Sequence, residues 1–391
     1  MGHPWDAITL AELHQRRSAK WRRYPADVLP AWVAEMDLPL AEPVRAALVD
    51  LVGRSDTGYM DPFGDRTARA WAGFAARAWG QQVDPSLAQV VPDVVRGLEA
   101  VLAVTAPAGA PVVVDSPSYP PFVDVLAGTG RPMVRASLVR GADGRWVPDL
   151  EAVESAYASG ARVHLLCNPH NPTGTVLRAD ELLALADLAD RYGVLVVADE
   201  IHAPLVRRGV QFTPFGALDH PAAGRAVTLV SASKAWNLAG LKCALLLGGP
   251  DGGAELLGAL PKELPVGASL FGQVATEVAL EHGGPWLAQL HDYLDAGLDR
   301  LAALTAEHLP ELRWTRPEGT YLAWLDCRGL GLEGGEAVDP AAAFLERGRL
   351  ALGVGTDFGP EGVGHVRLTA AVPHPLLDEI VRRMAAALPG R

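Results

Sequence analysis

The sequence predicts an α/β protein with a mostly parallel β-sheet and a second, smaller α+β unit toward its C-terminal end. Between about residues 90 and 250, short apolar segments rich in β-branched residues alternate with amphipathic helical segments. Strands that are apolar along their whole length are typical of parallel sheets covered by helices on both faces. After residue 267 the pattern changes to longer helices with fewer strands, which indicates a different unit.

The elements can be assigned in order along the chain. Leucines at positions 182, 183, 185 and 188 form one face of a predicted helix at 179–191. Beyond the sheet region we expect a helical stretch at 273–308 that breaks near 283–285, strands at 320–327 and 365–369, and a final helix at 375–388. We therefore predict a large domain at 46–272 and a small domain formed by 1–45 and 273–391. The predicted strands of the large domain are 111–115, 162–167, 194–199, 226–231 and 243–248.

Composition narrows the class of protein. The net charge is −12, which argues against nucleic acid or an anionic membrane as the main partner. Three scattered cysteines do not suggest a disulfide framework or a metal site. No apolar run is long enough to span a membrane, and the basic stretch at 16–23 is interpreted as a solvated helix face. We expect a cytoplasmic protein without a metal.

Three polar clusters follow predicted strands, at 168–174, 199–202 and 231–234. Ligands of parallel sheets bind beyond the carboxyl ends of the strands, where such clusters meet. The sequence therefore predicts one site built from all three clusters.

Lys234 lies in the third cluster, and it is one of only four lysines in the chain. An arginine can replace a lysine as a solvated charge, but only the lysine amine condenses with an aldehyde. Ser231 and Ser233 beside it, with loop N–H groups, are suited to a phosphate. A surface lysine is the alternative interpretation.

Asp199 ends a very apolar strand, where a carboxylate requires a cation or hydrogen-bond donors. A protonated pyridine nitrogen is a suitable partner and an electron sink. The alternatives for Asp199 are metal binding or helix capping. His202 is a candidate donor to a phenolic ring oxygen, or else a structural histidine.

The segment at 168–174 reads Asn-Pro-His-Asn-Pro-Thr-Gly and is the most specific string in the chain. A residue before proline is restricted to extended geometry, so the amide of Asn171 is held in place. This suits a donor aimed at a phenolate oxygen. An ordinary loop is the alternative interpretation.

Together these strings resemble the fold-type I pyridoxal-phosphate-dependent aminotransferase superfamily. Trp-Val-Ala-Glu-Met-Asp at 32–37 and Asp-Glu-Ile-His at 199–202 are similar to its cystathionine β-lyase-like branch, which cleaves carbon–sulfur bonds. The resemblance covers essentially the whole chain. It implies pyridoxal 5′-phosphate as the cofactor and a mostly parallel seven-stranded sheet in the large domain.

The resemblance also implies a role for each matching residue. Lys234 carries the cofactor's aldehyde carbon and moves the Cα proton, Asp199 pairs with the ring nitrogen, and Asn171 and His202 hold the phenolic oxygen. The other implied roles are ring stacking for Tyr119, phosphate binding for Val94, Val95, Ser231, Ser233 and Lys242, phosphate binding across a dimer for Tyr59, and substrate binding for Arg367 and Asp37. A core tyrosine is the alternative for Tyr119.

Three positions depart from the usual pattern of the superfamily. Lys242 stands where an arginine is common, Asp93 where a glycine often opens the phosphate-binding helix, and His202 where transaminases usually have a tyrosine. The histidine favours the lyase branch.

The predicted function is a C–S β-lyase acting on cystathionine or another cysteine S-conjugate, in a homodimer with active sites at the interface. An aminotransferase of a specialised amino acid is the nearest alternative, because the fold does not decide the outcome. A non-catalytic pyridoxal-phosphate-binding regulator is the alternative from another class.

Overall fold

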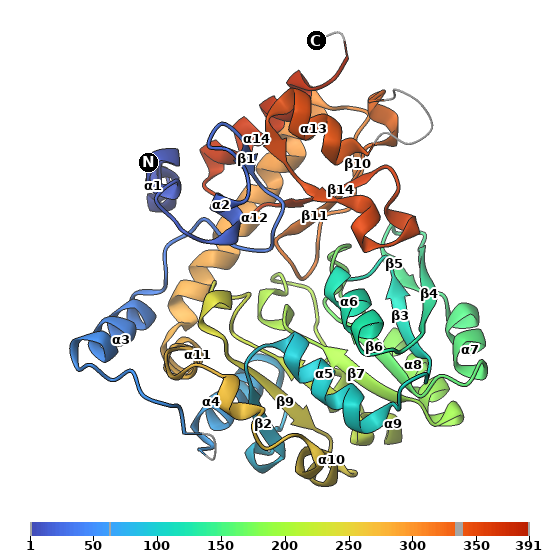
Figure 1. Ribbon diagram of the computed structural model, residues 1–391. Coiled ribbons are helices and arrows are strands. Elements are labelled where there is room, and N and C mark those ends of the chain that lie inside the picture. Colours follow the sequence, from blue (N-terminus) through green and yellow to red (C-terminus); the bar gives the residue numbers. More distant parts are fainter. Residues whose placement is uncertain (1, 62–63, 333–338, 390–391) are drawn as a thin grey trace.

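The structure is a computed structural model that describes residues 2–61, 64–332 and 339–389. Its large unit is a twisted sheet surrounded by helices (Figure 1). In the described part of the chain this sheet has eight strands: β2 (Ala88–Val91), β3 (Val112–Ser116), β4 (Met133–Arg140), β5 (Trp146–Pro148), β6 (Val163–Cys167), β7 (Leu195–Asp199), β8 (Val227–Val230) and β9 (Ala244–Gly248).

The strand order is β2-β9-β8-β7-β6-β3-β4-β5, and only β9 and β5 run against the other strands. The predicted mostly parallel sheet is therefore confirmed. The expected number of seven strands is one too low, because the three-residue β5 pairs with the end of β4. The five predicted strands correspond to β3, β6, β7, β8 and β9.

Helices cover both faces of the sheet, as apolar parallel strands require. The side chains of β3 show the alternation: Val112 and Val114 pack under α5 and α6, whereas Val113 packs against α7 and α8 on the opposite face. The helices of this unit are α3 (Glu42–Gly53), α4 (Arg66–Trp79), α5 (Val94–Thr105), α6 (Pro120–Gly128), α7 (Leu150–Ala158), α8 (Ala179–Tyr192), α9 (Pro221–Arg225), α10 (Gly253–Ala259) and α11 (Leu270–His282).

The smaller unit is α+β, as predicted. Its antiparallel sheet has the order β10-β11-β14-β13, and the N-terminal segment joins it through a parallel pair of β1 and β12. Its elements are α1 (Leu10–Leu13), α2 (Ala19–Arg22), β1 (Leu29–Pro30), β10 (Arg313–Trp314), β11 (Leu322–Asp326), α13 (Pro340–Gly348), β12 (Leu350–Ala351), β13 (Gly353–Val354), β14 (His365–Thr369) and α14 (His374–Ala386).

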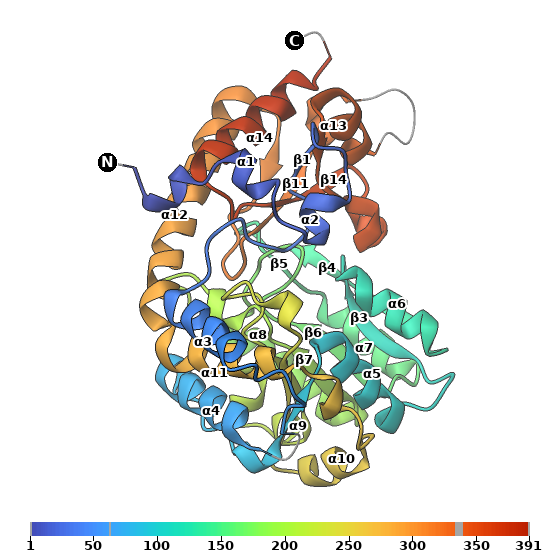
Figure 2. The same cartoon turned by 60° about the vertical axis from the view of Figure 1, so that its left-hand side comes forward.

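The long helix α12 (Gly284–His308) runs from the large unit to the small one (Figures 1 and 2). The predicted break near 283–285 is the junction of α11 and α12. Leu294 packs in the core shared with the large unit, whereas Leu298 packs in the core of the small unit. The expected boundary at 272/273 falls inside α11, which packs against α3 and α4. The hydrophobic core thus changes within α12, later in the chain than the expected boundary. The division into two domains stays a prediction.

The basic stretch at 16–23 is not simply a solvated face. The Lys20 side chain is fully buried, and its Nζ lies 2.7 Å from Oδ2 of Asp37, which is also fully buried. Trp21 Nε1 donates to the other carboxylate oxygen of Asp37 at 2.8 Å. A buried ion pair tolerates the loss of neither partner, because the remaining charge stays desolvated. Asp37 therefore anchors the N-terminal segment.

In the described ranges, no helix is both long and apolar enough to cross a bilayer. The same residues contain no group of three or more His, Cys, Asp or Glu side chains placed to bind a metal ion.

The buried pair yields a stability prediction. Replacing Asp37 by Asn leaves the Lys20 ammonium without its counter-charge, so we expect the free energy of unfolding to fall by about 3–5 kcal/mol. Glu42→Gln is the control, because it breaks the exposed Glu42–Arg45 pair and should cost at most about 1 kcal/mol. Urea denaturation of both variants measures the difference. Equal losses would contradict a structural role for Asp37.

Candidate active site

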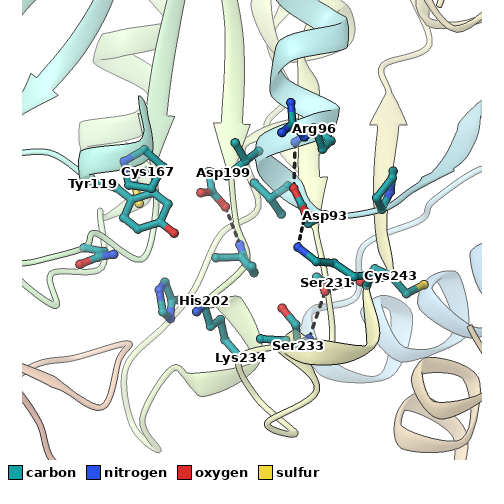
Figure 3. A pocket seen from close by; sticks show the side chains of 18 residues that line it. Asp93, Arg96, Tyr119, Cys167, Asp199, His202, Ser231, Ser233, Lys234 and Cys243 are labelled. Carbon is teal, nitrogen blue, oxygen red and sulfur yellow. Dashed lines mark hydrogen bonds and ion pairs between the residues drawn. The ribbon is translucent and has the colours of Figure 1, made fainter. Parts of the chain in front are cut away.

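The carboxyl ends of the parallel strands open into a cavity of about 400 Å³. Figure 3 shows Tyr119, Asp199, His202 and Lys234 around this space. The three predicted polar clusters meet here, because each follows a strand of the same parallel set. The cavity is lined by ten of the residues predicted from the sequence: Val94, Val95, Tyr119, Asn171, Asp199, His202, Ser231, Ser233, Lys234 and Lys242.

Lys234 reaches the cavity from the loop after β8. Its Nζ donates to the backbone carbonyl of Ala34 at 3.1 Å. Burial, followed by the nearby charge of Arg367, lowers the pKa of Lys234 to about 8. A larger fraction of the amine is therefore neutral near pH 7 than for an exposed lysine, and the neutral amine is the nucleophilic form.

Asp199 ends β7 and is buried. The Ile201 N–H donates to its Oδ1 at 3.1 Å, and burial raises the pKa of Asp199 to about 6. No described cation lies within ion-pair distance of this carboxylate. A buried anion in this state favours a cationic ligand group such as a protonated ring nitrogen.

Asn171 is oriented by a contact from the small unit. Arg367 Nη1 donates to Asn171 Oδ1 at 2.9 Å, which leaves the Asn171 NH₂ group as the free donor. His202 is buried as well, and its Nδ1 has no partner in the described residues. Burial and the Lys234 charge lower the pKa of His202 well below its ordinary value, so the ring is neutral. Both side chains thus present unused hydrogen-bonding capacity, as a phenolic ring oxygen requires.

The opposite end of the cavity is the N-terminus of α5, which begins at Val94. Backbone N–H groups and the helix dipole make such an end favourable for a phosphate. The unexpected acid Asp93 caps this helix by accepting from the Arg96 N–H at 2.9 Å. Its other oxygen lies 2.8 Å from Lys242 Nζ, so the two charges compensate each other. Although burial opposes it, the Lys242 hydrogen bond lowers the pKa of Asp93.

The two serines differ in what they can offer to a phosphate. The Ser231 hydroxyl donates its one hydrogen to the carbonyl of Cys243 at 2.7 Å and accepts from the Ser233 N–H at 3.0 Å. Ser231 therefore shapes the turn and has no hydrogen left for a ligand. Ser233 also lines the cavity, and its hydroxyl makes no hydrogen bond to the described residues. The predicted phosphate role thus fits Ser233 better than Ser231.

Arg367 in β14 lies beside this cavity and lines a second one of about 290 Å³. Its Nη2 donates to the Trp32 carbonyl at 3.0 Å, and its Nε has no partner in the described chain. The Phe358 ring lies 4.8 Å from the guanidinium carbon. Burial lowers the pKa of Arg367 to about 10, so the group stays charged at neutral pH. No described carboxylate pairs with this buried cation, which favours an anionic ligand.

Tyr119 lines both cavities, at the N-terminus of α6. Its ring contacts Phe122 edge-on, and burial raises the pKa of Tyr119 to about 12, so the hydroxyl is neutral. A flat neutral ring at this place is suited to stacking on a second aromatic ring.

Two predicted residues lie outside both cavities. Asp37 is committed to Lys20 and Trp21, so the expected substrate contact is not made, and its role is structural. Tyr59 is 92% exposed and lines neither cavity. Its position leaves the side chain available to a second subunit, and the contact across a dimer stays a prediction.

Sequence reasoning missed the contributions of the N-terminal segment. Ala34 contributes only its backbone carbonyl, which no sequence pattern marks. Tyr321 donates to the same carbonyl at 3.1 Å, so it positions the acceptor of Lys234. Cys167, also missed, lines the cavity beside Asp199 at the end of β6. Its position at the end of a predicted buried strand was the feature of the sequence that could have identified it.

The residues fit pyridoxal phosphate. An amine of lowered pKa, a buried unpaired carboxylate, two unused hydrogen-bonding groups and a helix N-terminus lie around one cavity. Each corresponds to one part of that cofactor: the aldehyde, the ring nitrogen, the phenolic oxygen and the phosphate.

The comparisons with known proteins agree with this geometry. The family model for aminotransferase class I and II matches residues 33–384. A protein of Mycobacterium tuberculosis assigned as a cystathionine beta-lyase is 44% identical and covers 99% of this chain and 98% of its own. The cystathionine beta-lyase of Corynebacterium glutamicum is 35% identical, with 97% and 99% covered. The solved pyridoxal-phosphate-bound C–S lyase of Staphylococcus hominis has a TM-score of 0.89 at 25% identity, with 96% of each chain covered. Because the family model and these relatives span nearly the whole sequence, this chain belongs to the class I and II aminotransferase family.

Proposed function

We propose that this protein is a pyridoxal-phosphate-dependent C–S β-lyase. In the proposed reaction a cysteine S-conjugate and water give a thiol, pyruvate and ammonia. The observation that carries the proposal is the buried amine of Lys234, on whose pKa the charges of the buried Asp199 carboxylate and of the Arg367 guanidinium both act. Full-length relatives named as cystathionine beta-lyases support the reaction type.

The bound cofactor supplies the aldehyde that captures the substrate amine and the ring that accepts negative charge from Cα. The side chains of this protein do the rest. Arg367 binds the substrate α-carboxylate, using the Nε that has no protein partner. Asp199 keeps the ring nitrogen protonated, because its own buried charge is otherwise uncompensated. Asn171 and His202 hold the phenolic oxygen, and Tyr119 packs on the ring face.

Lys234 is the general base of the proposed reaction. Because the pKa of Lys234 is lowered to about 8, about half of its Nζ is neutral at pH 8 and more above it, and this neutral amine would take the Cα proton. The Ala34 carbonyl, 3.1 Å from Nζ, holds the amine at the cavity wall. The bound cofactor would allow either elimination of a β-thiolate or transamination, and the position to which Lys234 returns the proton would decide between them.

We also infer a cytoplasmic homodimer. Tyr59 is exposed, and the nearby α3 exposes Val49 and Val52. Apolar side chains gathered on one surface favour contact with another protein surface. The proposed two-fold dimer covers this face and brings Tyr59 to the phosphate of the other subunit.

The reaction type has a direct test. We expect purified protein with pyridoxal phosphate to release thiol and pyruvate in equal amounts from a cysteine S-conjugate without any oxo-acid acceptor. Turnover that needs an oxo acid would identify an aminotransferase instead. Cofactor binding without turnover of any amino acid would identify a regulator.

Replacing Lys234 by Ala should abolish thiol release, because no other lysine lines the cavity except Lys242, whose amine is paired with Asp93. Circular dichroism should show an intact fold, and dialysis should show cofactor bound without a covalent link. Lys262→Ala is the matched control, since Lys262 is exposed and outside the cavity. Comparable activity in the two variants would refute the assignment.

The pKa of Lys234 predicts how the cofactor-free protein captures pyridoxal phosphate. Only the neutral amine attacks the aldehyde, and the pKa is lowered, so the rate of covalent capture should rise with pH around a midpoint of about 8 and then level off. Stopped-flow absorbance measures this rate. A midpoint near 10.5, the ordinary value for a lysine, would contradict a desolvated amine.

A further inference from the structure

The second cavity adjoins the proposed reaction centre on the substrate side. It shares Tyr119 and Pro121 with the first cavity and contains Arg367 in its wall. With the substrate carboxylate on Arg367 and its amine at the cofactor, the group attached to sulfur needs a space next to both. This cavity provides it, in a volume of about 290 Å³. The inference below therefore rests on the proposed function.

Two opposite charges line this cavity, Arg23 and Asp357. The guanidinium carbon of Arg23 lies 5.2 Å from the Trp32 ring centroid. A guanidinium stacked on a ring keeps its N–H edge free for a carboxylate. Neither charge has an ion-pair partner among the described residues, although the nearby Arg349 pairs with Asp27 at 2.7 Å. Arg23 and Asp357 thus remain available to a ligand.

The surroundings of Asp357 are short of positive charge. Although Asp357 is an exposed residue, its partial desolvation and then the carboxylate of Asp339 raise its pKa, and Asp124 acts in the same direction. Among the described groups that act most on the pKa of Asp357, Arg23 is the one cation, and it lowers that pKa. An ammonium group near Asp357 relieves this repulsion. The cavity therefore favours a ligand with a cation at one point and an anion at another.

An unused donor in the wall points to a ligand independently of these charges. The buried Nε1 of Trp32, which lines the cavity, has no hydrogen-bond partner in the described chain. The unpartnered Nε of Arg367 is already assigned to the α-carboxylate. Buried donors without partners are uncommon in folded proteins and are expected to be satisfied by a bound molecule or water.

We propose that Arg23 and Asp357 determine which cysteine S-conjugates the protein cleaves, by binding a carboxylate and an ammonium group on the leaving thiol. Arg23 binds the carboxylate and Asp357 binds the ammonium. Cystathionine, which the names of the relatives already point to, has both groups on its second half, and Arg23 and Asp357 are the side chains assigned here to recognise them. Conjugates with neutral alkyl or aryl groups leave both charges without partners and are poorer substrates.

Four conjugates test the assignment: S-ethylcysteine as neutral, S-(2-aminoethyl)cysteine with an ammonium, S-carboxymethylcysteine with a carboxylate, and cystathionine with both. Arg23→Gln should lower kcat/KM for the two carboxylate-bearing conjugates by about tenfold more than for S-ethylcysteine. Asp357→Asn should do the same for the two ammonium-bearing conjugates. Thiol release measures each value.

Arg22→Gln is the matched control, because it removes the same charge from the adjacent residue. Arg22 donates to the His14 carbonyl at 3.1 Å and does not line the cavity. Its ratio of kcat/KM for cystathionine to that for S-ethylcysteine should equal the parent ratio. The proposal is overturned if Arg23→Gln and Asp357→Asn reduce all four substrates equally or leave all four unchanged.

Calorimetry separates this proposal from the proposed lyase function. Binding of the four conjugates to the Lys234→Ala protein, with the same substitutions added, reports charge selection without turnover. A charge preference in binding, with no thiol release by the parent protein, would refute the lyase and support the cavity. Thiol release without any charge preference would refute the cavity alone.

Discussion

The structure depends on three charged groups that are buried near one another without forming ion pairs among themselves. Lys234, Asp199 and Arg367 lie at the junction of the two units, and burial shifts the pKa of each toward its neutral form. Such an arrangement is unfavourable by itself, because each charge loses water and gains little in return. It becomes favourable when a ligand supplies an aldehyde, a cationic ring nitrogen and a carboxylate.

The segment from Trp32 to Asp37 holds these groups in position. The carbonyl of Ala34 accepts from Lys234, and the carbonyl of Trp32 accepts from Arg367. Asn237 binds both the N–H and the carbonyl of Met36, at 2.9 and 3.0 Å. Asp37 fixes the end of the segment through the buried Lys20. The segment thereby joins the strand ends of the large unit to β14 of the small one. Because Asp37 fixes the end of this segment, a change at Asp37 would alter the backbone that holds Lys234 and Arg367.

The two cavities have different proposed roles, cofactor binding and substrate selection. The first is defined by groups that match a cofactor and changes little with the identity of the substrate. The second lies between the N-terminal segment and residues 352–358, so its charges come from parts of the chain outside the central sheet. This separation lets the chemistry of the strand ends stay constant while Arg23 and Asp357 select the group on sulfur. The same reasoning explains why fold alone does not specify a substrate.

The sequence by itself determined the parallel sheet, the cofactor and most of the predicted residues that line the first cavity, because those residues follow buried strands in short, local patterns. Asp199, Asn171 and Lys234 could be predicted for this reason. It did not reveal β2, β4 or β5, whose residues are less buried and lack a continuous apolar run. Only the tertiary structure decided that Asp37 pairs with Lys20, that the Ser231 hydroxyl donates to the Cys243 carbonyl, and that Arg23 and Asp357 line one cavity. These contacts join residues far apart in the chain, or backbone atoms, and no local pattern encodes them.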